Sequence, residues 1–256
     1  FGQRPKSRTR TFSSTSSAVA HSRHSSAIRF SLRRHEVLRT QARAVLRAAA
    51  HARIDLVLPM ISDITDVRRA RAIIEEESGR LKKEGCTVGH VRVGAMIEVP
   101  SAVLVAEKLA LEVDFFSLGT NDLVQYTLAV DRGNDEVADW FRSLHPAVLL
   151  SIRRTLDAAA GAGIPSVVCG EMAASPAYAT ILVGLGAREL SMAPSAIPRV
   201  RRTLAGLEYE EAARIALECL ECATADEVEE KVRVRLLGRW PNLFTPEMLP
   251  HPKNKG

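Results

Sequence analysis

Short aliphatic runs alternate with longer amphipathic stretches along most of this chain. Five runs rich in Val, Ile, Leu and Phe have the length of β-strands, and each is followed by a stretch with helical periodicity. The predicted strands are residues 54–61, 91–100, 113–120, 164–170 and 188–194. The predicted helices are residues 34–51, 64–85, 101–111, 146–162, 176–185, 196–204 and 208–222. Such alternation predicts an α/β fold of parallel βα units, with strands buried on both faces.

The number of strands bears on the kind of parallel fold. A closed (β/α)8 barrel needs eight strands, and only about five are recognisable. The first 26 residues, FGQRPKSRTRTFSSTSSAVAHSRHSS, are rich in Ser and Arg and have no apolar period. We expect residues 1–26 to be a disordered or irregular head that supplies no strand. The pattern alone leaves a barrel with missing strands and an open sheet as alternatives.

Composition and charge are those of an ordinary globular protein. The chain has 256 residues, of which 46% are hydrophobic and 25% charged. No window approaches 18 uncharged apolar residues, so we expect no membrane span. The net charge is +5, but residues 1–35 hold eight Lys and Arg residues and no acid, so the rest is net acidic. The basic charge therefore indicates a solvated arm rather than a nucleic-acid surface.

The four cysteines indicate a reducing compartment, and we expect a cytoplasmic protein. They are Cys86, Cys169, Cys219 and Cys222. The last two form a CxxC pair inside a stretch with helical periodicity. A zinc site needs about two further ligands at suitable spacing, and none is apparent. We therefore interpret this pair as two thiols on one helix.

Polar side chains gather where the predicted strands end. Glu98 follows one strand, Asn121 and Asp122 follow the next, and Cys169 ends a later one. The carboxyl ends of parallel strands form the catalytic edge of barrels and open sheets alike. Two converging carboxylates, Glu98 and Asp122, would suit Mg²⁺, which takes one or two carboxylates plus substrate oxygens and water. Alternatively, each caps the helix that follows it.

Two further side chains are candidates for chemistry. Arg132, ten residues after Asp122, would bind phosphate or carboxylate with its guanidinium fork. Its alternative is an ion pair with Asp131 or Asp135. Cys169 would be a nucleophile or a proton donor. Its alternative is a small buried hydrophobic side chain.

Four long motifs carry a family resemblance. GAMIEVPSA, DFFSLGTNDLVQYTLAVDRGND, VVCGEMA and ELSMAPSAIPRVRR resemble the C-terminal barrel of the phosphoenolpyruvate-utilising enzymes, and in particular Enzyme I of the bacterial sugar phosphotransferase system. The resemblance runs from about Ala27 to the helix end near residue 222. It implies a partial TIM (β/α)8 barrel of about five βα units over residues 27–222, followed by a C-terminal helix and tail over residues 223–256.

The resemblance also implies roles for the candidate residues. Glu98 and Asp122 match the Mg²⁺ ligands of the family. Asn121 and Asp122 lie in the segment that contacts the phosphate of the substrate, and Arg132 matches an arginine that binds phosphoenolpyruvate. Cys169 matches the general acid that protonates the enolate at its methylene carbon and so gives pyruvate.

The implied activity is that of a phosphoenolpyruvate–protein phosphotransferase. Such an enzyme is a cytoplasmic homodimer that takes part in sugar transport. It passes the phosphoryl group to a histidine on a separate N-terminal domain and then to the carrier HPr. We expect this fragment not to be competent alone, since it carries no such domain. A pyruvate phosphate dikinase or phosphoenolpyruvate synthase is an alternative, although YTLAVDRGND favours Enzyme I. Another alternative is an inactive remnant that binds an anion or a partner.

Two departures from the family pattern concern positive charge. No RTLDIGGD-like motif with its substrate arginine is present, and Ser26 stands where an arginine is expected directly before AIR. Each lost charge-assisted contact would weaken binding of an anionic ligand by roughly 1.5–3 kcal/mol.

Overall fold

Six parallel strands form one sheet in the computed structural model, which describes residues 10–13, 31–131, 133–134 and 137–250. The strands pair in chain order, each with its neighbour in the sequence. Their bounds are β1 (Arg10–Ser13), β2 (Ile54–Leu58), β3 (Val91–Ile97), β4 (Phe115–Gly119), β5 (Ser166–Cys169) and β6 (Glu189–Ser191). The α/β prediction of parallel βα units is therefore confirmed.

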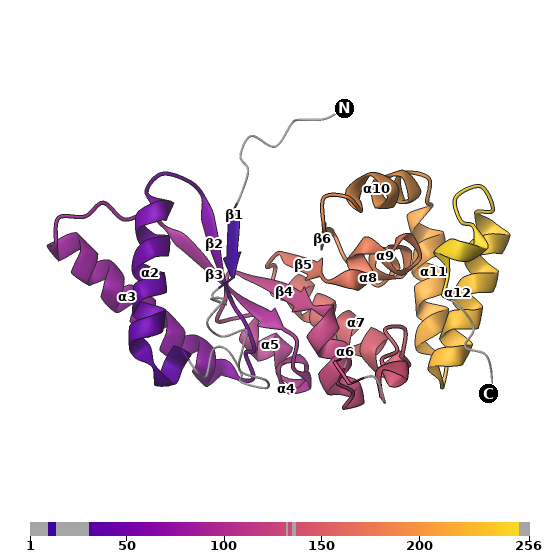
Figure 1. The fold of residues 1–256 in the computed structure, drawn as a ribbon, viewed down its shortest axis with the longest axis horizontal. Helices are drawn as coiled ribbons and strands as arrows, with labels where there is room; N and C mark the ends of the chain where they lie inside the picture. Colours follow the sequence, from indigo (N-terminus) through magenta and orange to yellow (C-terminus); the bar gives the residue numbers. More distant parts are fainter. Residues whose placement is uncertain (1–9, 14–30, 132, 135–136, 251–256) are drawn as a thin grey trace.

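Helices follow the strands and flank the sheet in chain order, from α2 at one end to α12 at the other (Figure 1). Their bounds are α2 (His35–Ala49), α3 (Ile64–Lys83), α4 (Pro100–Leu104), α5 (Ala106–Leu109), α6 (Thr120–Leu128), α7 (Pro146–Gly161), α8 (Glu171–Ala174), α9 (Pro176–Gly184), α10 (Ile197–Ala205), α11 (Tyr209–Leu220) and α12 (Ala225–Arg239). Each predicted helix is present within a few residues, except that the stretch 101–111 forms two short helices. Among the described residues, no helix has both the length and the apolar character that a bilayer span requires.

The expectation that residues 1–26 supply no strand is wrong. Residues Arg10–Ser13 form β1, which pairs in parallel with β2 from Arg10 opposite Ile54 to Ser13 opposite Val57. The sequence of β1, RTFS, carries no hydrophobic signal of its own. Backbone N–H and C=O groups pair in a sheet regardless of side chain, so an existing edge can recruit a short polar segment that periodicity does not reveal.

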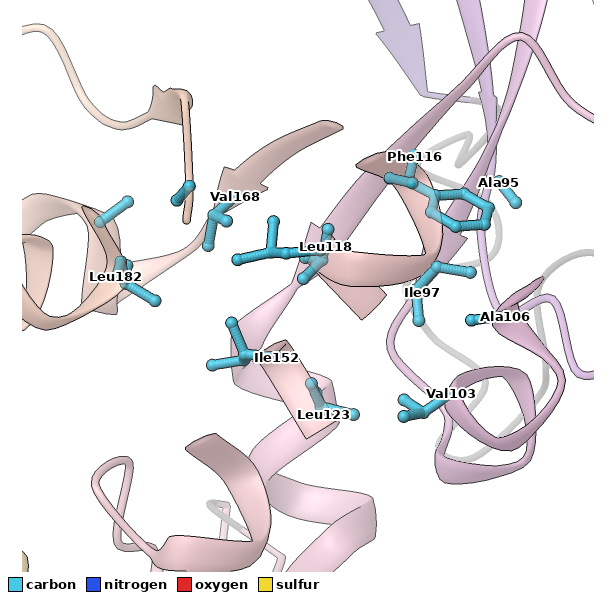
Figure 2. Packing of buried hydrophobic residues seen from close by; sticks show 14 of the residues in the cluster. Ala95, Ile97, Val103, Ala106, Phe116, Leu118, Leu123, Ile152, Val168 and Leu182 are labelled. Carbon is cyan, nitrogen blue, oxygen red and sulfur yellow. The ribbon is translucent and has the colours of Figure 1, made fainter. Parts of the chain in front are cut away.

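One face of the sheet packs against the helices and forms the main core. Alternate strand residues such as Ala95, Phe116 and Val168 are fully buried in one hydrophobic cluster with helix residues. Figure 2 shows Leu118 of β4 close to Leu123 of α6 and Ile152 of α7. The period of two along each strand assigns these residues to the helix side.

The intervening residues line the opposite face, which carries several polar and charged side chains among apolar ones. Arg92 of β3 makes a two-point ion pair with Asp55 of β2, with N–O distances of 2.8 and 2.5 Å. Its guanidinium also lies 5.4 Å from the centre of the Phe115 ring. A cavity of about 470 Å³ opens on this face. Its wall comprises Arg53, Asp55, Arg92, Phe115, Phe116, Ser117, Pro165, Ser166, Val167, Cys169, Glu189 and Ser191.

The expectation of strands buried on both faces holds for β2 but not for the last strand. All five residues of β2 are buried, whereas Glu189 and Ser191 of β6 are exposed. Within the part of the chain that the structure describes, helices cover only one face of the sheet. The other face of β6 therefore borders the open cavity.

Candidate functional site

Three neighbouring strands bring four of the predicted site residues to one edge of the sheet. Glu98 directly follows β3, Asn121 and Asp122 lie in the first turn of α6 after β4, and Cys169 is the last residue of β5. The registers of β3 with β4 and of β4 with β5 place Gly119 opposite Cys169 at this edge. The convergence expected from the strand ends is therefore present.

Neither carboxylate caps a helix. The N-cap of α4 is Val99, and the N-cap of α6 is Gly119, in both cases without a hydrogen bond from the capping side chain. Glu98 precedes its helix by one further residue, and Asp122 is the third residue of α6. The alternative that these carboxylates serve only as caps is therefore wrong.

Glu98 is buried and almost removed from water. Its side chain is 3% exposed, and its Oε1 accepts a hydrogen bond of 2.7 Å from the backbone N–H of Met60. Burial raises the pKa of Glu98 to about 8, the Met60 hydrogen bond opposes this rise, and the nearby charge of Asp122 adds to it. The two carboxyl groups are also in hydrogen-bonding contact. Burial and the neighbouring carboxyl group therefore together disfavour the ionised form of Glu98.

Two backbone positions shape the surroundings of Glu98. A Cβ on Gly119 would lie 2.6 Å from Oε2 of Glu98, closer than non-bonded atoms approach. Met60 has a φ of 56°, in the left-handed region that a side chain seldom adopts. The Met60 N–H that meets Glu98 therefore comes from a strained turn after β2, as is common at functional sites.

Cys169 belongs to the wall of the polar cavity and not to the apolar core. Its thiol donates to the carbonyl oxygen of Leu118, with an S–O distance of 3.0 Å, and lies 3.6 Å from Oγ of Ser117. Burial raises the pKa of the thiol, the Ser117 hydroxyl opposes this, and the charge of Glu98 raises it further. The thiol is thus predominantly protonated near neutral pH. These polar contacts do not fit the alternative of a small buried hydrophobe.

The turn after β4 also holds the backbone around Cys169. Oγ1 of Thr120 donates to the carbonyl oxygen of Cys169 at 2.9 Å, and Oδ1 of Asn121 accepts from the N–H of Glu171 at 3.3 Å. Gly170 has a φ of 114°, and a Cβ there would collide with Oγ1 of Thr120. The turn after β4 and the turn after β5 therefore form one unit, in which the side chains of Thr120 and Asn121 hold the backbone of Cys169 and Glu171.

The carboxyl pair fits a hard cation such as Mg²⁺. The described residues contain no cluster of three or more His, Cys, Asp or Glu side chains arranged to hold a metal. Mg²⁺ does not require one, because it commonly takes one or two carboxylates and completes its shell with water and substrate oxygens. A cation bound beside the pair would favour the ionised form of the buried Glu98 carboxyl group.

Other candidates lie elsewhere or outside the described residues. Arg132 is outside them, so neither its proposed anion contact nor its alternative ion pair is tested. Cys219 and Cys222 are both free, and Cys219 is buried in α11 as expected. Cys222 lies just past the end of that helix, so the prediction of two thiols on one helix is wrong for Cys222.

Sequence reasoning missed Met60, Ser117 and Thr120. Thr120 was visible within the GTND motif, but its contact with the Cys169 carbonyl depends on strand register. Met60 and Ser117 gave no signal in the sequence, since their roles arise from a backbone N–H and from a neighbouring strand.

Comparison with known proteins shows which sequences this chain resembles. A family model described as "PEP-utilising enzyme, PEP-binding domain" matches residues 25–209. The phosphoenolpyruvate-protein phosphotransferase of Haemophilus influenzae is 40% identical over 212 residues, which cover 82% of this chain and 37% of that protein. The protein of that name from Geobacillus stearothermophilus is 43% identical over 208 residues, which cover 81% of this chain and 36% of that protein. The chain thus spans little more than a third of the length of these relatives.

A solved structure supports the fold. A citrate lyase from Burkholderia xenovorans aligns with a TM-score of 0.50 at 18% identity, over 78% of this chain and 69% of that one. At this identity the likeness concerns the fold alone, which is of the TIM-barrel type. With six strands in the described residues, this chain corresponds to part of such a barrel, as expected.

Proposed function

Because this chain belongs to the PEP-utilising enzymes through their PEP-binding domain, we propose that the edge where β3, β4 and β5 end binds phosphoenolpyruvate together with Mg²⁺. The observation that carries the proposal is the meeting of Glu98, Asp122 and Cys169 at this edge, where Asp122 raises the pKa of Glu98 and both carboxyl groups raise the pKa of Cys169. Two carboxyl groups that would hold Mg²⁺, beside a protonated thiol, suit a ligand that is anionic at one end and becomes an enolate at the other.

Each residue has a distinct part in this proposal. Glu98 and Asp122 hold the Mg²⁺, which neutralises charge on the phosphate when it is bound. Asn121 and Arg132 bind the anionic groups of the substrate, since positioning and charge neutralisation supply most of the catalysis of phosphoryl transfer. Cys169, protonated at neutral pH, gives its proton to the methylene carbon of the enolate and yields pyruvate.

The proposed reaction is that of a phosphoenolpyruvate–protein phosphotransferase. The phosphoryl group passes to a histidine on a separate domain and then to HPr, and the assembly is a homodimer. These partners follow from the resemblance to Enzyme I, and this chain matches little more than a third of the named phosphotransferases. The proposal for the described residues themselves is therefore the half-reaction that takes place on phosphoenolpyruvate.

Isothermal titration calorimetry with phosphoenolpyruvate tests the proposal. We expect binding in the presence of Mg²⁺ and loss of binding when the metal is removed with a chelator. Glu98→Gln and Asp122→Asn should each weaken binding by about tenfold to a hundredfold, since each removes a charge-assisted contact of about 1.5–3 kcal/mol.

A matched control is Glu210→Gln, because this exposed glutamate lies in the first turn of α11 and does not line the cavity that holds Cys169. It should leave the affinity unchanged. If the unsubstituted chain gives no heat with phosphoenolpyruvate and Mg²⁺, the proposal is wrong, and the inactive remnant becomes the better interpretation. Equal effects of Glu98→Gln and Glu210→Gln would contradict the assigned location.

A further inference from the structure

The hydroxyl of Ser117 lies beside the Cys169 thiol, across two paired strands. Ser117 is in the middle of β4, its side chain is 5% exposed, and its Oγ is 3.6 Å from the sulfur. Both side chains line the same cavity of about 470 Å³ on the polar face of the sheet. A buried hydroxyl is nearly always hydrogen-bonded, and here the sulfur is within reach of it.

The directions of the hydrogen bonds follow from the donors present. The thiol proton points to the carbonyl oxygen of Leu118, with an S–O distance of 3.0 Å. That oxygen can only accept, so it offers nothing to a sulfur that has lost its proton. The hydroxyl of Ser117 can donate. Together with the backbone N–H of Cys169, it is therefore a neutral group at this site that favours the thiolate.

We propose that Ser117 is a positioning residue, which holds the Cys169 thiol toward the substrate site and donates a hydrogen bond to the thiolate formed by proton transfer. This inference rests on the proposed function. In that step the S–H bond breaks and a C–H bond forms at the methylene carbon of the enolate. The electron pair of the C=C bond makes the new bond, and the enolate oxygen becomes the ketone oxygen. The sulfur keeps the S–H electron pair until a proton from water restores the thiol.

The charged surroundings make such a donor useful. Glu98 at the end of β3 and Asp122 in α6 both disfavour a negative sulfur. Glu171 of α8 follows two residues after Cys169. The charged residues on the cavity wall are Arg53, Asp55, Arg92 and Glu189, and Arg92 and Asp55 are paired with each other. Within the described residues, a neutral hydroxyl at hydrogen-bonding distance thus partly opposes the effects of burial and of two nearby carboxyl groups on the thiol pKa.

The test measures the reactivity of Cys169 directly, without substrate and without metal. The full chain is treated with iodoacetamide over a range of pH, and modification of Cys169 is followed by peptide mass spectrometry. Only the thiolate reacts. In Ser117→Ala we expect the midpoint of the profile to rise by about one pH unit and the rate below both midpoints to fall about tenfold, as for the loss of one hydrogen bond to a charged group. Ser117→Thr retains a hydroxyl and should restore most of the rate.

Two variants separate this role from a general change in the cavity. Ser191→Ala removes a hydroxyl of the same cavity wall, from the residue paired with Cys169 on β6, and should leave the profile unchanged. Ser117→Gly removes the same hydroxyl together with Cβ and must reproduce the shift. This second variant keeps the test decisive if Ser117→Ala does not fold. An unchanged profile in the folded Ser117 variant would overturn the inference.

The thiol profile and the binding of phosphoenolpyruvate are measured separately, so a failure of this inference can be told from a failure of the proposed function. If the chain does not bind phosphoenolpyruvate but Ser117→Ala shifts the thiol profile, the proposed function fails and the link between Ser117 and the thiol stands. If the chain binds phosphoenolpyruvate and the profile does not move, only the role of Ser117 fails.

Discussion

The carboxylate of Glu98 occupies space that is open because Gly119 has no side chain. Gly119 has an ordinary negative φ of −85°, so the glycine is needed for space and not for backbone conformation. A methyl group there would lie 2.6 Å from Oε2 and 3.1 Å from Cβ of Glu98. Because Glu98 is buried and its other oxygen is fixed by Met60, the side chain has little room to withdraw.

Gly119→Ala should therefore impair the site more than the fold. We expect the affinity for Mg²⁺ with phosphoenolpyruvate to fall at least about tenfold, because the contact displaces a ligand carboxylate. Calorimetry with thermal unfolding in parallel measures both effects. Gly161→Ala is the control: nothing lies within 4 Å of its added Cβ, and it ends α7. That change should slightly stabilise the chain and leave binding intact. Unaltered binding in Gly119→Ala would contradict the steric argument.

At the scale of elements, ion pairs link α2 to α3. Glu77 of α3 is buried and accepts hydrogen bonds from Arg39 and Arg43 of α2, at 2.5 and 3.2 Å, and from Arg80 at 3.1 Å. Burial alone would raise the pKa of Glu77, but the hydrogen bonds from Arg39 and Arg43 outweigh it and lower the pKa below the usual 4.5. The ionised form is therefore favoured by folding.

The sign of the pH dependence follows from this shift. A carboxyl group with a lowered folded pKa stabilises the protein above its unfolded pKa and loses that contribution as pH falls through the folded value. Glu77→Gln should cost about 1–3 kcal/mol at neutral pH, and the difference from the unsubstituted chain should shrink below pH 4.5. Urea unfolding across pH measures this, with Glu75→Gln on the exposed side of α3 as the control. A difference that persists in acid would exclude the ionic origin.

At the scale of the whole molecule, the last long helix shares the core of the family domain. The family match ends at residue 209, yet Val232 and Leu236 of α12 are fully buried in the same hydrophobic cluster as the strands. Arg142, before α7, also makes a two-point ion pair with Glu229 of α12, at 2.9 and 2.7 Å. This packing implies that α12 folds as part of the domain.

Leu236→Ala should accordingly destabilise the entire described fold. We expect a loss of about 2–5 kcal/mol, as for other buried leucines, within a single unfolding transition. Val234→Ala changes a side chain on the same helix that is 56% exposed, and it should cost less than about 0.5 kcal/mol. Denaturant unfolding followed by circular dichroism and by Trp fluorescence distinguishes the outcomes. Two separate transitions would mean that α12 is an independent unit.

The order of strands and helices could be predicted from the sequence because the signal for each is local. The run IDLVL and the periodic stretch after it identify β2 and α3 whatever surrounds them. The position of Glu98, Asp122 and Cys169 after strands was equally visible, since strand ends follow from the ends of apolar runs. Parallel topology then predicts that such residues meet at one edge.

The sequence by itself determined the βα order, the family motifs and the edge at which the polar groups gather. The tertiary structure alone decided that RTFS is a strand, that Glu98 is the buried carboxyl group, that Gly119 must lack a side chain and that Ser117 meets the thiol. Hydrophobic periodicity is a property of residues that are close in the sequence. Register, burial and hydrogen-bonding contact join residues tens of positions apart, so they exist only once the strands are paired.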